Sequence, residues 1–220
     1  PAPPALWSGY AEARSQLERQ FRILADHWHK GYGQEVKRSA IAFFVLIVIF
    51  FGACMAVPSL RELLAGQVLP LFGGLDVTDE NGAFSALALF SNNVRACSVT
   101  MVYGLLPYVQ LSALALGANA MVIGVLAAYC LTADTSALAF FLGILPHGIF
   151  ELPALVLAFA MGLYVCGQLT RRCRHDETAL PLWDCVTLLS WLLLLVVIPL
   201  LAVAAVMEAY VTPLLLSLVM

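Results

Sequence analysis

Charged side chains are scarce in this sequence. Only 11% of its 220 residues are charged, and 62% are hydrophobic; a soluble domain carries roughly 25% charged residues. Four long stretches contain no charged residue at all, namely 39–60, 96–133, 152–170 and 185–207. A helix that crosses the hydrocarbon needs about 20 mainly apolar residues, so each stretch can hold at least one crossing. The stretches also lack the polar outer face that a helix of a large soluble protein needs, which excludes that class.

Two other features are missing. There is no basic patch beyond short flanks of the apolar stretches, so we expect no nucleic-acid partner. The six cysteines form no CxxC pair, and most lie inside apolar stretches, where they are typical of small packing residues. Cys173, His175 and Cys185 lack a fourth ligand and a recognisable spacing for zinc. The sequence therefore predicts no metal and no cofactor.

The apolar stretches predict an all-α fold, a polytopic membrane bundle of about five transmembrane helices. Residues 1–38 are the expected cytoplasmic segment with an N-terminal amphipathic helix, and 39–220 the transmembrane domain. The spans are expected at about 39–57, 84–106, 108–131, 144–166 and 185–207, with 59–83 outside the membrane. Pro107 predicts a tight connection between the second and third spans. Gly143 and Pro146 predict a short lead-in before the fourth span.

The N-terminal segment has helical periodicity. Its apolar residues make one stripe with spacings of four, three and four, formed by Leu17, Phe21, Leu24 and Trp28. The stripe fits a helix that lies on the membrane surface, which we favour, or one that docks onto the cytoplasmic face of the protein itself. Gly31 is expected to help end this helix before the first span.

Basic residues predict the orientation. Six lysines and arginines precede the first span and three follow the fourth, whereas 59–83 has one arginine against four acidic residues. With five spans, the two basic segments lie on the same side of the membrane. The positive-inside rule then places the protein in the cytoplasmic membrane with its N-terminus in the cytoplasm and its C-terminus outside.

Polar side chains within the spans are the candidate site residues, because such groups are costly in lipid. They are Asn92, Asn93, Arg95, Asn119, His147, Glu151 and Glu208. The predicted topology puts them in one layer of the outer half of the bilayer. His147 and Glu151 are four residues apart and share a helix face. Arg95 is the expected ion partner of Glu151 or Glu208.

This polar layer has three interpretations. It is an internal clamp between spans, a site that binds or passes an ion, a proton or a lipid headgroup, or a centre of metal-dependent catalysis. The third interpretation is the weakest, because the HxxxE pair supplies only two ligands.

Several motifs resemble one known family. The run LPHGIFELPALVLAFAMGLYV (145–165) is similar to the Pro-His-Gly-Xaa-Xaa-Glu-Xaa-Pro signature of the stage II sporulation protein M family. FSNNVRA (90–96) and EAYVTP (208–213) resemble further segments of that family. LGANAMVIG (116–124) resembles another, with Ala120 in place of the usual glycine. The resemblance covers most of 40–213, in order.

The resemblance implies a function. The founding member of the family takes part in engulfment in spore-forming bacteria, as a membrane scaffold for peptidoglycan-degrading partners. We therefore expect a scaffold or assembly factor linked to envelope remodelling, with envelope proteins and the lipid bilayer as partners. The alternatives are a transporter or channel-like protein that uses the polar layer, and an intramembrane hydrolase with Glu151 as base. Gly162 and other small residues also allow a homodimer.

Overall fold

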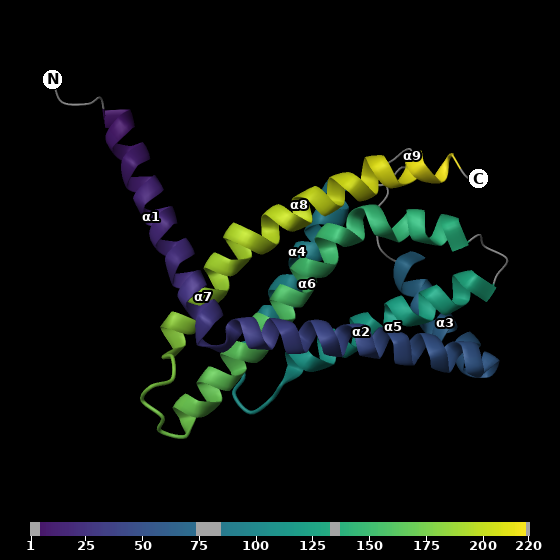
Figure 1. The fold of residues 1–220 in the computed structure, drawn as a ribbon, viewed down its shortest axis with the longest axis horizontal. Coiled ribbons are helices and arrows are strands. Elements are labelled where there is room, and N and C mark those ends of the chain that lie inside the picture. The colour runs from purple at the N-terminus through teal and green to yellow at the C-terminus, as the bar shows by residue number, and fades with distance from the viewer. Residues whose placement is uncertain (1–4, 74–84, 133–136, 219–220) are drawn as a thin grey trace.

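The computed structural model describes residues 5–73, 85–132 and 137–218, and every regular element in these ranges is a helix (Figure 1). This confirms the all-α prediction. The α-helices are α1 (Ala5–His27), α2 (Gly33–Ala56), α3 (Pro58–Gly73), α4 (Ala86–Val102), α5 (Leu111–Thr132), α6 (Ala137–Cys173), α7 (Leu182–Leu192), α8 (Ile198–Val206) and α9 (Thr212–Leu216). Four short turns of other helix types join some of them: η1 (Trp28–Tyr32), η2 (Tyr103–Leu105), η3 (Leu193–Val197) and η4 (Met207–Val211).

The helices match a membrane protein. Four helical stretches within the described ranges are long and apolar enough to cross a bilayer: 10–56, 111–132, 141–173 and 182–216. The remaining predicted span, 84–106, contains α4, which has 17 residues and is therefore about 26 Å long. The four long stretches and the shorter α4 together correspond in position to the five predicted spans.

The core is built around α6. Ala154, Ala158 and Phe159 on this helix are fully buried, and the Phe159 ring meets that of Phe43 on α2 with centroids 6.1 Å apart. Helices α2, α4, α5 and α8 all pack on α6. Small residues on α6 let these neighbours approach closely, as is usual where helices pack in lipid.

A second, smaller cluster holds α3 in place. Val68 of α3 is buried together with Cys54 of α2 and Val125 of α5. The first part of the predicted extramembrane segment is thus a helix packed on α2 and α5. Residues 74–83 of that segment lie outside the described residues.

The fourth predicted span differs from expectation at its start. The structure has one helix of 37 residues, α6, with Pro146 and Pro153 inside it. Helix α6 is visibly bent in Figure 1. A proline within a helix lacks an N–H and clashes with the carbonyl four residues earlier, so it kinks the helix. Pro146 therefore lies within α6, which continues to its N-terminal side as far as Ala137.

Helix α1 leaves the bundle at a bend before α2. Lys30 and Gly31 have non-helical backbone angles there, and Gly31 has φ +122°, a value that favours glycine. The base of α1 is tied to α6 by a His27–Tyr164 hydrogen bond of 3.2 Å. Tyr32 adds a second tie, since its hydroxyl donates to the Leu157 carbonyl at 3.0 Å.

Two prolines explain two wide turns in the C-terminal helix. Pro199 follows the π-helical turn η3, and Pro213 follows η4. Each proline cannot donate to the carbonyl four residues earlier and crowds it. Widening the preceding turn to π-helical spacing relieves this crowding. The proline of the EAYVTP motif therefore shapes the turn that carries Glu208.

Three segments meet at one end of the bundle. The backbone N–H of Tyr108, in the connection that follows Pro107, donates to the Thr170 hydroxyl at 2.8 Å. The Cys166 thiol donates to the Leu106 carbonyl at 3.3 Å. The Pro107 connection thus lies beside the C-terminal end of α6, next to the basic loop that follows it.

Candidate polar site

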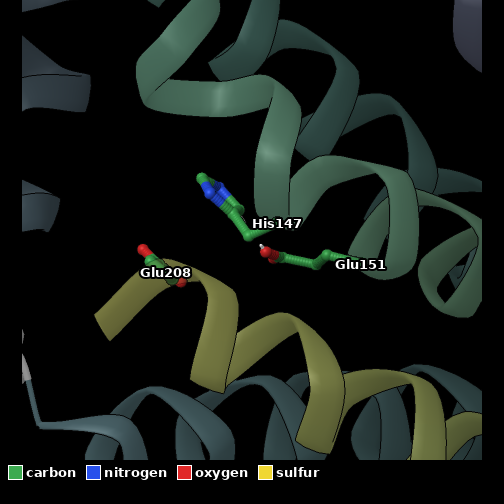
Figure 2. A group of neighbouring side chains, drawn as sticks. All are labelled: His147, Glu151 and Glu208. Atoms are coloured by element: carbon green, nitrogen blue, oxygen red, sulfur yellow. Dashed lines mark ion pairs between the residues drawn. The ribbon is translucent and has the colours of Figure 1, made fainter. Parts of the chain in front are cut away.

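Three predicted site residues converge in the structure. His147 and Glu151 come from α6 and Glu208 from η4, and Figure 2 shows their side chains gathered in the space between the two helices. One potential ligand atom from each lies within 4.8 Å of the other two. His147 Nε2 and Glu151 Oε2 are 4.0 Å apart. We call this group the His-Glu-Glu cluster.

The cluster is largely buried, and one of its polar atoms lacks a hydrogen-bond partner among the described residues. The side chains of His147 and Glu151 are 15% and 21% exposed. The Nδ1 atom of His147 is buried and has no hydrogen-bond partner in the described part of the chain. Polar atoms in such places almost always have a partner in native proteins, so the site calls for one that the protein itself does not supply.

Local sequence explains two of the three positions. His147 and Glu151 are one helical turn apart, so both project from the same face of α6. The turn that carries Glu208 is widened by Pro213. The packing of α6 against η4 and α9 then brings the two motifs together.

The other four predicted residues lie elsewhere. Asn92 and Arg95 of α4 and Asn119 of α5 line a cavity of about 740 Å³ between these two helices. The Asn119 amide donates to the Ala115 carbonyl of its own helix at 2.8 Å. Asn93 is half-buried and belongs neither to the lining of this cavity nor to the His-Glu-Glu cluster.

The expected ion pair of Arg95 is not observed. Among the described residues, Arg95 forms no ion pair with Glu151 or Glu208, and it is exposed. Cys97 is the residue of α4 that is completely buried in the core. Arg95 lies two residues earlier, about 200° around the helix, and therefore faces away from the packed side.

Sequence reasoning missed one polar pocket. A cavity of about 260 Å³ lies between α1 and α7 and is lined by His27 and Asp184, among others. Burial lowers the pKa of His27, with a smaller contribution in the same direction from the Lys30 charge. Neither His27 nor Asp184 belongs to a motif, so no signal in the sequence identified the pocket.

The His-Glu-Glu cluster has a clear chemical capacity. One imidazole and two carboxylates can share protons or can bind a cation. The sequence suggested only two ligands, and Glu208 is the third. The signal was present, because Glu208 already belonged to the predicted polar layer; what the sequence lacked was the contact between η4 and α6.

Comparison with known proteins gives the family. No curated protein and no solved structure matches the chain. The family described as Stage II sporulation protein M matches residues 40–213, which include α4, the whole His-Glu-Glu cluster and the two proline-shaped turns. This match covers well over half of the chain and confirms the resemblance in its motifs. The protein is a membrane-embedded helical bundle that belongs to the stage II sporulation protein M family.

Proposed function

We propose that this protein is a membrane scaffold that assembles proteins of cell-envelope, and specifically peptidoglycan, remodelling. The observation that carries the proposal is the position of α1. In Figure 1 this helix extends away from the rest of the molecule. Tyr10, Leu17 and Phe21 on it are 65%, 42% and 50% exposed. A helix with an uncovered apolar stripe suits the binding of another helix in a groove or between partners.

The base of α1 supports the same role. Its contacts with Tyr164 and the packing of Leu24 on the core fix one end of the helix to the bundle. Nearer its N-terminus, α1 carries apolar side chains that the rest of the protein leaves exposed. Such a helix presents a partner surface at a defined place beside the membrane domain.

The proposed orientation places this surface in the cytoplasm. The base of α1, the Pro107 connection and the basic loop after α6 lie near one another at one end of the bundle. The nearness of the base of α1 to this basic loop supports an orientation in which both lie on the cytoplasmic side, as the positive-inside rule favours.

Site-specific photo-cross-linking in living cells tests the scaffold. A photoreactive residue at Phe21, within the full chain, is expected to capture envelope proteins that mass spectrometry identifies as peptidoglycan enzymes or their regulators. Arg19 is the matched control, because it is exposed on the same helix but lies about 200° from Leu17. Adducts with lipid only at Phe21, or identical protein adducts from both positions, would contradict the proposal.

A loss-of-function variant provides a second test of the scaffold proposal. The double substitution Leu17→Glu and Phe21→Glu places charge on the exposed stripe without touching the bundle. We expect the melting temperature of the purified protein to stay unchanged while the muropeptide profile of the cell shifts toward that of a deletion strain. A normal profile would rule out α1 as the partner surface.

A second candidate function is transport, and the cavity between α4 and α5 favours it. Arg95, Asn92 and Asn119 give this cavity a polar lining within otherwise apolar helices. Reconstituted protein tests the idea. Transport predicts ion or proton flux into proteoliposomes that falls in the Arg95→Gln variant, whereas a scaffold predicts no flux above that of empty vesicles.

A further inference from the structure

Two carboxylates meet in the bundle without a lysine or arginine partner among the described residues. Glu151 and Glu208 belong to helices far apart in the sequence, and their oxygens lie within 4.8 Å of each other and of His147. The four ion pairs recorded among the described residues include no lysine or arginine at this place. Two ionised carboxylates this close repel strongly in poorly solvated surroundings, so their charge has to be compensated by protons or by a bound cation.

We propose that His147, Glu151 and Glu208 bind a divalent transition-metal cation, with Zn²⁺ as the representative ion. One imidazole nitrogen and one oxygen from each carboxylate are the protein ligands. The role is independent of the partner surface on α1, and it adds a metal site to the scaffold function.

The separations of the ligand atoms fit such an ion after a small adjustment. Zinc binds imidazole nitrogen and carboxylate oxygen at about 2.0–2.2 Å, which puts tetrahedral ligand atoms about 3.3 Å apart. The observed separations of 4.0 Å for His147–Glu151 and up to 4.8 Å within the cluster exceed this by about 1.5 Å at most. Rotation of the two glutamate side chains supplies the movement while the helices stay in place.

Charge and donor type select the class of ion. As metal ligands, two ionised carboxylates and a neutral imidazole carry a net charge of −2, which one divalent cation neutralises. Imidazole nitrogen favours zinc and related transition metals over Mg²⁺ and Ca²⁺, which prefer oxygen ligands alone.

Metal binding has a structural consequence. The ligands join α6 to η4, so a bound ion cross-links the centre of the bundle to its C-terminal helix. Three protein ligands also leave a fourth position for water, as in zinc sites that are open to small molecules.

Direct binding to the full-length protein tests the proposal. Protein purified in detergent is stripped with a chelator and titrated with Zn²⁺ by calorimetry. We expect one equivalent per chain, and a melting temperature that rises on binding. Replacing Zn²⁺ with Co²⁺ reports the ligand type, since nitrogen and oxygen ligands give weak visible bands, whereas cysteine thiolates add intense near-ultraviolet absorption.

Variants assign the ligands. Glu208→Gln and His147→Asn are each expected to weaken Zn²⁺ binding at least 100-fold, a large loss for removal of one of only three ligands. Glu62→Gln, on α3, is the matched control and should bind as the wild type does. The Co²⁺ spectrum of the wild-type protein gives a decision even where a variant does not fold.

Three results would overturn the metal site. The first is stripped wild-type protein that binds no Zn²⁺ and melts at the same temperature with and without it, which would assign the compensating charge to protons. The second is a thiolate-type Co²⁺ spectrum. The third is unchanged binding in both ligand variants.

Discussion

Gly104 and Gly162 lie backbone to backbone where the turn η2 crosses α6. A Cβ atom on Gly104 would overlap the carbonyl oxygen, Cα and carbonyl carbon of Gly162. A Cβ atom on Gly162 would overlap the hydroxyl of Ser112, which donates to the Thr100 carbonyl at 2.8 Å. Removing the side chain at both positions lets the α4–α5 connection pack directly on the central helix.

We therefore expect Gly162→Ala to destabilise the protein by about 1–3 kcal/mol, the usual effect of overpacking a tight contact. Its rigid neighbours are backbone atoms and a short hydroxyl, which cannot move aside. Unfolding in detergent, followed by circular dichroism, measures the change. Gly167→Ala on the same helix is the control, because no described atom beyond the adjoining residues and backbone of α6 lies within 4 Å of the added methyl group. Equal stability of the two variants would contradict this account of the crossing.

The loop after α6 carries a pH-sensitive turn. Hydrogen bonds from the Thr178 hydroxyl and from Arg171 lower the pKa of Asp176 from its ordinary 3.8 to about 2. Because the pKa is lowered in the folded loop, ionised Asp176 stabilises the turn above about pH 4. This stabilisation is lost as the pH falls from about 4 to about 2.

An NMR titration of the Asp176 carboxyl carbon is expected to have its midpoint near pH 2. Protection of the Thr178 amide, which donates to Asp176 at 3.0 Å, should decrease over the same range. The Asp176→Ala variant, which has no side-chain acceptor, should lack this protection at every pH. A midpoint near 4 would show that the turn does not hold the carboxylate in solution.

The predicted orientation can be tested with a native cysteine. Cys173, at the end of α6, is exposed, whereas Cys54, Cys97, Cys166 and Cys185 are buried. A membrane-impermeant maleimide should label Cys173 in inside-out vesicles and leave it unlabelled in intact spheroplasts. The label should disappear in Cys173→Ser. Labelling in spheroplasts that is lost in Cys173→Ser would reverse the proposed topology.

The sequence predicted the helices well because their signals are local. Charge-free stretches of about 20 residues define the spans, and the spacing of His147 and Glu151 alone places them on one face. Gly31 likewise indicated the end of the N-terminal helix. Each of these inferences needs only neighbours within one or two helical turns.

The rest depended on how the helices are rotated against one another, which no local pattern encodes. Arg95 was expected beside Glu151 because both lie at similar predicted depth, yet the packed side of α4 is that of Cys97. The convergence of Glu208 with His147 likewise requires the contact of η4 with α6. The charge pattern predicted how deep each residue lies in the membrane. The packing of the core determines how each helix is rotated about its own axis.

The bend at Gly31 makes α1 a lever. Its 23 residues give an arm about 35 Å long, hinged at one backbone torsion that side chains rarely adopt. A rotation of about 10° at this hinge would move the free tip by about 6 Å, while the aromatic contacts of His27 and Tyr32 with Tyr164 resist it. The position and direction of a partner bound to α1 are therefore set by a few side chains at the base of the helix.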